Sequence, residues 1–174
     1  PATKRLPDYT LEQFRNSSPV PHPWRASINV ILRALFPDDG GLLCIGRDNA
    51  HFATRRIEDF GDSLQRASLI VPAFMTARHG RTKKDKLSEH SLENTGPRRF
   101  IVCDFDEPSP AEQPRIINYL RQFRPLVCIV GSGGKSLHAW FLSQGEEQDR
   151  DFWDLAILHG ADPVLRANRS SFVR

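Results

Sequence analysis

The chain has 174 residues, of which 39% are hydrophobic and 26% are charged. This length is sufficient for one domain with a hydrophobic core, and the composition is ordinary for a globular protein. No apolar run is long enough to span a membrane and the N-terminus lacks a signal-peptide pattern, so we expect a cytoplasmic protein without a membrane partner. The net charge of +3 is only a weak indication of a polyanionic partner.

The three cysteines, Cys44, Cys103 and Cys128, are isolated from one another in apolar, strand-like surroundings. They form no C-x-x-C pair, so we expect no structural zinc. Reduced thiols in the core of a cytosolic protein are the better interpretation.

The first half of the chain begins with a proline-rich arm, residues 1–24, and continues into a domain that extends to the last residue, 174. Apolar spacing predicts a helix over residues 27–36, which ends at the breaker PDDGG. The segments LLCIG (42–46) and ASLIVPAFM (67–75) read as strands, and the polar stretch 55–65 between them is expected to be partly helical.

A long charged loop is predicted over residues 76–97. It contains the basic stretch RHGRTKKDK, which is either a solvated loop or a surface that contacts nucleic-acid phosphates. The basic side chains of this stretch are Arg78, Arg81, Lys83, Lys84 and Lys86.

From residue 98 the pattern is sharper. Strands are predicted at 98–106, 125–130 and 137–142, and helices at 109–123 and 149–158. This order predicts an α/β (α+β) fold with a mixed sheet of ferredoxin-like or RNA-recognition-motif-like type, preceded by an N-terminal α/β subregion, 25–96.

The first of these helices has two possible starts. Ser109 and Glu112 fit a capping box with Pro110 at the first helical position, whereas Pro114 would place the start later. The second helix is expected to end at His159 and Gly160.

Two aspartates, Asp104 and Asp106, follow the apolar run FIVC. On a continuous strand they would share a face about 7 Å apart, and two ionised carboxylates that close repel each other unless a cation lies between them. Their hard oxygen ligands suit Mg²⁺ or Mn²⁺. Alternatively, the strand ends at Asp104 and the run DFDEPSP is a solvated turn.

The segment GSGGKS (131–136) resembles the end of a phosphate loop, but Ile129 stands where a Walker motif requires glycine and a strand follows instead of a helix. A glycine-rich hairpin with Ser132, Lys135 and Ser136 still offers an anion site, to which His138 could contribute. A tight hairpin followed by an ordinary strand histidine is the alternative.

Asp162, in the segment GADP, is the best candidate for a third carboxylate, because two-metal sites need more than two acids. The alternative is an ordinary turn after the helix. Arg166, Arg169 and Arg174 follow it and could bind a polyphosphate or a template strand.

Together, the motifs CDFDE, SGGKSLH and GAD with NRSSFVR resemble those of the archaeo-eukaryotic primase superfamily. The resemblance covers residues 97–174, and the upstream half reads like the N-terminal part of primases from plasmids, phages and other mobile elements. It implies that Asp104, Asp106 and Asp162 hold two Mg²⁺ or Mn²⁺ ions. It also implies contacts to the incoming triphosphate from Ser132, Lys135, Ser136, His138 and Arg169.

Two positions depart from the family pattern. Ser136 stands where many members have glycine, which weakens the expected backbone contact there, and Asp106 replaces the glutamate of some relatives. The second change should preserve metal binding.

The resemblance implies a DNA primase-polymerase that catalyses template-directed nucleotidyl transfer on single-stranded DNA from nucleoside triphosphates. It also implies a longer protein with a fused or separate helicase. One alternative is a non-catalytic, primase-like DNA-binding replication module. The other is a rolling-circle nickase, which needs paired histidines and a nucleophilic tyrosine, whereas the chain has only Tyr9 and Tyr119.

Overall fold

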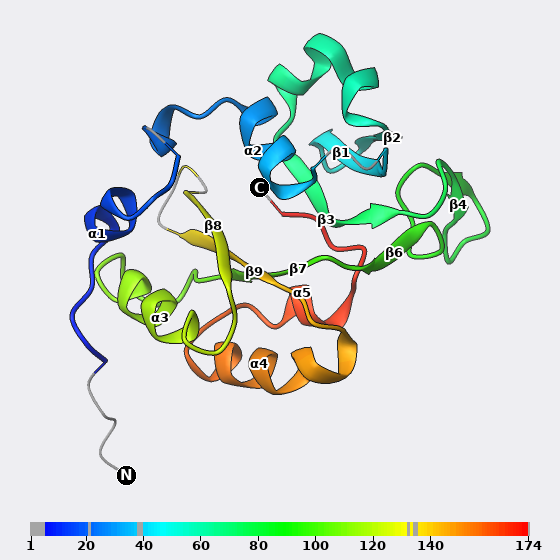
Figure 1. Cartoon of the computed structure of the whole chain (residues 1–174). Helices are drawn as coiled ribbons and strands as arrows, with labels where there is room; N and C mark the ends of the chain where they lie inside the picture. Colours follow the sequence, from blue (N-terminus) through cyan, green and yellow to red (C-terminus); the bar gives the residue numbers. More distant parts are fainter. Residues whose placement is uncertain (1–5, 21, 38–39, 132, 134–135, 174) are drawn as a thin grey trace.

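The computed structural model describes residues 6–20, 22–37, 40–131, 133 and 136–173 (Figure 1). Its helices, with η for 3-10 helices, are α1 Leu11–Asn16, η1 Pro23–Arg25, α2 Ile28–Leu35, η2 Ile57–Arg66, α3 Gln113–Leu120, α4 Glu146–Leu158 and α5 Val164–Ala167. Its strands are β1 Leu42–Asp48, β2 His51–Arg55, β3 Leu69–Met75, β4 Gly80–Arg81, β5 Leu87–Ser88, β6 Thr95–Arg98, β7 Phe100–Asp104, β8 Leu126–Gly131 and β9 Leu137–Leu142. The fold is mixed α/β with antiparallel sheets.

The first sheet has the strand order β2-β1-β3-β6, and each neighbouring pair is antiparallel. The predicted strands at 42–46 and 67–75 are confirmed as β1 and β3. The sequence did not predict β2, because this edge strand buries only Thr54 and therefore lacks an apolar alternation. The polar stretch that follows it forms η2, which confirms the helical character expected there.

The second sheet has the order β7-β9-β8, and β9 is antiparallel to both of its neighbours. It follows that β7 and β8 are parallel to each other, with α3 as the connection between them and β9 inserted in the middle. The three predicted strands are confirmed, although β7 ends at Asp104 and not at residue 106.

One extended segment joins the two sheets. It pairs with β3 through β6 and, after Arg99, with β9 through β7. The Arg98 guanidinium in this segment donates to the carbonyl groups of Leu165 and Arg166, at 2.6 and 2.7 Å. The C-terminal segment then returns to the first sheet, where Val173 and Ile70 exchange two backbone hydrogen bonds of 2.8 Å.

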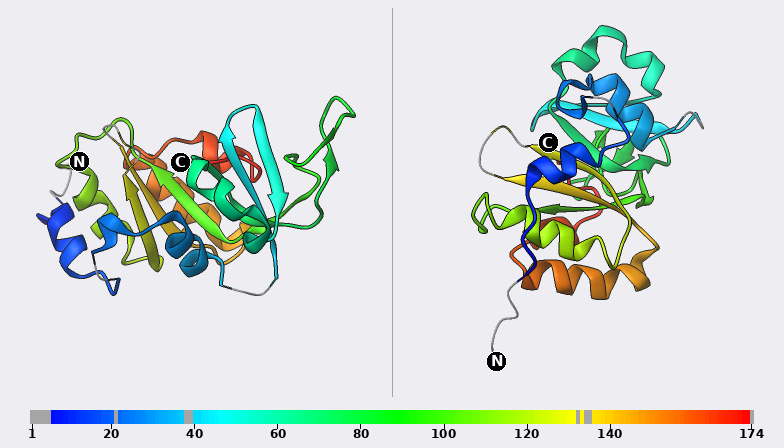
Figure 2. Two further views of the ribbon diagram at one scale, coloured as in Figure 1. Left: turned by 90° about the horizontal axis from the view of Figure 1, so that it is seen from above. Right: turned by 60° about the vertical axis from the view of Figure 1, so that its left-hand side comes forward.

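The largest cluster of buried apolar side chains extends across both sheets, from Leu32 in α2 through β1, β7 and β9 to Phe152 in α4. In Figure 1 and in the right-hand view of Figure 2, α3 and α4 lie together on the side of the molecule away from α2 and η2. α3 buries Ile117 and Leu120 completely, and the ring of Phe152 packs on Phe141 of β9 at a centroid distance of 4.9 Å. These contacts hold the helices against the second sheet.

The helix starts were predicted with mixed success. α2 follows the predicted helix 27–36, and Ser27 caps it by accepting from the Val30 N–H group. α3 begins at Gln113 with Pro114 in its first turn, so the later of the two predicted starts is correct. The Ser109–Glu112 hydrogen bonds do form, but they stabilise the turn before the helix.

The proline-rich arm packs against α3. Its short helix α1, which the sequence did not predict, is capped by Thr10 and Gln13 in a capping box. The Arg121 guanidinium lies over the rings of Tyr9 and Phe14, at 4.9 and 5.3 Å from their centroids. This part of the arm is therefore an element packed on the domain.

Candidate functional site

The first and second motifs meet across two paired strands. Asp104 ends β7 and lies directly opposite His138 in β9. Asp104 Oδ2 is 3.1 Å from His138 Nε2, and the side chains are only 20% and 5% exposed. At this distance an Nε2–H group donates a hydrogen bond to the carboxylate, and a protonated imidazole would also form an ion pair.

The third motif joins the same end of the sheet through its backbone. The Asp162 N–H group donates a 2.9 Å hydrogen bond to the Asp104 carbonyl group. The Asp162 carboxylate accepts from the Val164 N–H group at 2.9 Å, in the turn that the sequence offered as the alternative interpretation. Asp162 is therefore both a turn residue and a neighbour of Asp104.

Gly160 makes this return of the chain possible. Its φ of +91° is in the left-handed region that favours glycine, and a Cβ atom there would be 2.8 Å from Pro108 Cγ. The close approach brings the end of α4 against the loop that follows Asp104. Sequence reasoning identified Gly160 only as a helix stop.

Asp106 does not lie on the strand, and the prediction that it continues β7 is wrong. β7 ends at Asp104, Phe105 is completely buried, and Asp106 is exposed in the following bend. The physical reason lies in the partner strand, where the residue before His138, Leu137, donates its N–H group to Gln113 Oε1 and the ladder therefore ends at Asp104. This is the turn that the alternative interpretation of DFDEPSP described.

A residue that sequence reasoning missed connects the first two motifs. Gln113 is only 1% exposed. Its Nε2 group donates to the Pro108 carbonyl group and its Oε1 atom accepts from the Leu137 N–H group, both at 2.9 Å. Helical spacing did contain a signal, because Gln113 lies three, four and seven residues before the buried residues Ile116, Ile117 and Leu120.

The glycine-rich loop is described only in part. Ser132 and Lys135, both predicted to contact a triphosphate, lie outside the described residues. Gly133 has a φ of +81°, and Ser136, at the start of the returning strand, is 7% exposed. The loop follows β8 at Gly131 and leads into β9, so it begins and ends at the sheet edge that carries Asp104 and His138.

Arg169 lies elsewhere. Its Nη1 atom is 4.0 Å from Glu146 Oε1 at the start of α4. Glu146 follows the end of β9 that is opposite to His138. The strand from His138 to Leu142 is about 13 Å long, so the two sites are at least this far apart along β9. Arg169 lines a cavity of about 390 Å³ with Arg98, Arg150 and Arg166. The structure therefore does not bring Arg169 together with His138.

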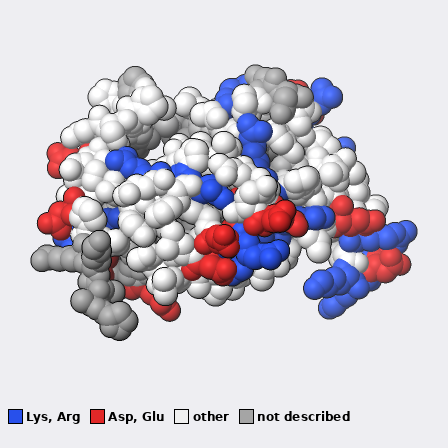
Figure 3. All heavy atoms as spheres, turned by 60° about the horizontal axis from the view of Figure 1, so that its bottom comes forward, with Lys and Arg blue, Asp and Glu red and all other residues white. Residues whose placement is uncertain are grey.

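The predicted basic stretch forms the β4–β5 hairpin, which projects from the body of the molecule (Figure 2). Arg81 pairs with Asp85 at 3.0 Å and Arg78 with Glu89 at 2.9 Å. The exposed lysines of the hairpin are Lys83, Lys84 and Lys86. Figure 3 shows acidic and basic side chains interspersed on the face it presents, so no single basic stripe covers that face.

The carboxylates differ from a preformed metal centre. In the part of the chain that the structure describes, no group of three or more His, Cys, Asp or Glu side chains is placed to hold a metal ion. Cys103 adjoins Asp104 but offers no thiolate, since burial raises the pKa of its thiol well above the ordinary value. The site that is described is the pair Asp104–His138, with Asp162 beside it.

Comparisons with known proteins identify no relative of this chain: no protein-family model, no curated protein and no solved structure matches it. None of the helices in the described ranges combines the length and the apolar character needed to cross a bilayer.

Proposed function

We propose that this chain is the catalytic core of a DNA primase-polymerase, which transfers nucleotides from nucleoside triphosphates to a growing strand on a single-stranded DNA template. The observation that carries the proposal is the meeting of all three motifs at one sheet edge. Asp104 faces His138 at 3.1 Å, and Asp162 donates to the Asp104 carbonyl group at 2.9 Å. These residues are far apart in the sequence, so the fold must bring them together.

The proposal extends to the fold class. A β7–α3–β8 crossover with β9 inserted between its strands resembles the split βαβ arrangement of ferredoxin-like and RNA-recognition-motif-like sheets. The first sheet, formed within residues 25–98, would be the N-terminal extension of a primase catalytic core. The likeness is one of topology and supports the function only together with the site.

The donor chemistry of the three acids fits a hard divalent cation, because all their ligand atoms are carboxylate oxygens. Asp104, Asp106 and Asp162 would hold the ions, with side-chain rotation needed at the exposed Asp106 and at the turn residue Asp162. When bound, two such ions supply a lowered pKa for an attacking hydroxyl group and charge neutralisation on the leaving pyrophosphate.

His138 and Ser136 would bind and orient the incoming nucleotide. Both are nearly buried at the start of β9, so their rotamers are restricted by packing. Asp104 accepts from the His138 ring and would hold it in one orientation toward a phosphate oxygen. Ser132 and Lys135, outside the described residues, remain further proposed contacts to the triphosphate, whereas the position of Arg169 beside Glu146 removes it from this set.

The partners belong to the same proposal. Single-stranded DNA would be the template, with the hairpin side chains Lys83, Lys84 and Lys86 as phosphate contacts, and a helicase would act alongside in a cytoplasmic replication complex. Such contacts give sequence-tolerant, salt-dependent binding.

Primer extension on a defined template, with Mg²⁺ or Mn²⁺, tests the proposal. We expect wild-type incorporation to fall about a hundredfold or more in Asp104→Asn and Asp106→Ala, because the cation ligands are removed. The matched control is Asp151→Ala, which removes an exposed acid of α4 outside the site. Melting temperatures show whether each variant is folded.

Three outcomes would contradict the proposal. Equal incorporation by wild type and the Asp104 and Asp106 variants would exclude the site. DNA binding without incorporation by the wild type would favour the non-catalytic replication module. A covalent adduct between DNA and Tyr9 or Tyr119 would favour the nickase.

A further inference from the structure

A second concave site lies in the first sheet, and it shares no residue with the Asp104–His138 site. It is a cavity of about 530 Å³, lined by Leu42, Thr54, Arg55, Arg56, Asp59 and Arg78. Three of the lining residues are arginines: Arg55 at the end of β2, Arg56 just before η2, and Arg78 in the loop after β3. A volume of this size is in the range of small-molecule sites.

The arginines are not neutralised by the acid that lies among them. Within the described ranges, no Asp59 carboxylate oxygen comes within 4.0 Å of a nitrogen of Arg55, Arg56 or Arg78. Three like charges around one cavity repel each other, and counting both Asp59 and the Glu89 carboxylate that pairs with Arg78 still leaves an excess of one positive charge around the cavity. An anion in the cavity would remove this repulsion.

Arg55 is held in place but not saturated with hydrogen bonds. Its guanidinium lies 6.0 Å from the centroid of the Phe60 ring, which restricts the plane of the group. Its Nε atom is buried and, among the described residues, has no hydrogen-bond partner. Buried donors without a partner are uncommon and costly, so a side-chain movement that brings this nitrogen to an acceptor would be favourable.

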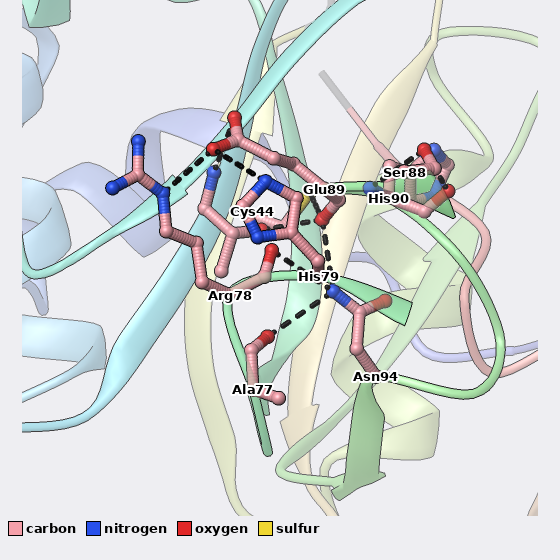
Figure 4. A network of polar contacts seen from close by, with 9 residues as sticks. Cys44, Ala77, Arg78, His79, Ser88, Glu89, His90 and Asn94 are labelled. Atoms are coloured by element: carbon pink, nitrogen blue, oxygen red, sulfur yellow. Dashed lines mark hydrogen bonds and ion pairs between the residues drawn. The ribbon is translucent and has the colours of Figure 1, made fainter. Parts of the chain in front are cut away.

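Arg78 is oriented by a fixed carboxylate. Its Nε group donates to Glu89 Oε1 at 2.9 Å, and Glu89 Oε2 accepts from the Thr54 N–H group at 3.3 Å. The Glu89 carbonyl group accepts in turn from Asn94 Nδ2 at 3.1 Å. Figure 4 shows the two terminal nitrogens of Arg78 pointing away from Glu89, so the pairing leaves them for a ligand.

We propose that Arg55, Arg56 and Arg78 form a binding site for phosphate groups, carried by a free nucleotide or by a nucleic-acid strand. The planar forks of arginine match the oxygens of phosphate, and charge-assisted hydrogen bonds of this kind are the stronger ones. The site does not depend on the proposed polymerase activity, because none of its lining residues belongs to the three motifs.

Binding of inorganic pyrophosphate and of a short single-stranded oligonucleotide, both measured in EDTA, tests the site with any cation-dependent binding removed. Arg56→Gln is the main variant, because Arg56 is exposed and its loss should leave the fold intact. We expect Arg56→Gln to weaken binding about tenfold, because the substitution removes about one charge-assisted hydrogen bond. Arg66→Gln, an exposed arginine at the end of η2, is the matched control and should bind like the wild type.

The two probes distinguish the sources. Pyrophosphate binding that weakens in Arg56→Gln indicates a free nucleotide. If only the oligonucleotide binds, and Arg56→Gln reduces the number of counterions released on binding by about one, the phosphates belong to a strand. Equal binding by the Arg56 variant, the control and the wild type, or binding of neither probe by the wild type, overturns the proposal. Arg78→Gln repeats the test at a second position.

Discussion

Asp104 and His138 are paired twice, once by the register of β7 and β9 and once by the 3.1 Å contact between Oδ2 and Nε2. Both side chains are largely buried, so this contact satisfies polar atoms that solvent reaches poorly. The contact therefore has consequences for stability as well as for the proposed chemistry.

The pair predicts energetic coupling. In a double-mutant cycle of Asp104→Asn and His138→Gln, we expect the unfolding free energies to deviate from additivity by about 0.5–3 kcal/mol. Urea denaturation followed by circular dichroism measures the four proteins. A second cycle, with the exposed Asp151→Asn in place of the Asp104 variant, should be additive within about 0.5 kcal/mol. Additivity in both cycles would mean that the contact is not formed in solution.

Gln113 should stabilise the site region through its two hydrogen bonds. Gln113→Met keeps a similar volume but leaves the Pro108 carbonyl and the Leu137 N–H group without their partner, so we expect a loss of about 1–3 kcal/mol in unfolding free energy. Gln122→Met, at an exposed position just after α3, should change stability by less than about 0.5 kcal/mol. Equal losses from both substitutions would argue against the bridge.

Gly160 should not tolerate a side chain. Gly160→Ala places a Cβ atom in a left-handed conformation and 2.8 Å from Pro108 Cγ, so we expect at least about 1 kcal/mol of destabilisation. Since the Asp162 turn follows directly, primer extension should also fall. Gly131→Ala, with nothing within 4 Å of the added atom, is the control for stability. A Gly160→Ala variant as stable as the wild type would show that the loop containing Pro108 rearranges at little cost in free energy.

The thiols should react slowly in the folded protein. Burial raises the pKa of Cys44 and of Cys128 to about 11, and that of Cys103 further. At about pH 8 we therefore expect little labelling by a thiol reagent until denaturant is added, when all three cysteines should react. Rapid labelling of Cys44 or Cys103 in the native protein would contradict the burial of these two side chains.

The same pKa shifts give stability a defined pH dependence. Between the ordinary thiol pKa of 9.0 and about 11, the unfolded chain releases protons that the folded chain retains at Cys44. The contribution of this thiol is therefore fully present below about pH 9 and is lost as the pH rises through 11. Urea midpoints measured across this range should fall, and Cys44→Ala should reduce the fall.

The sequence alone determined the elements whose signal is local. The apolar run of β3, the alternation of β9 and the spacing of α2 depend on neighbouring residues, so their patterns predicted them. The order of these elements also predicted mixed α/β structure with a strand–helix–strand unit from residue 98 onward.

Only the tertiary structure decided the features that depend on distant residues. β2 is a strand because β1 offers it a partner, and Asp106 leaves the sheet because the next residue of the partner strand, Leu137, donates its N–H group to Gln113 of α3. Arg169 lies near Glu146 because the C-terminal segment returns to β3, and Gln113 becomes a bridge only when α3 packs beside β9. Periodicity records which face of an element is apolar, whereas contacts between elements depend on how those faces are packed together, and no local pattern contains that information.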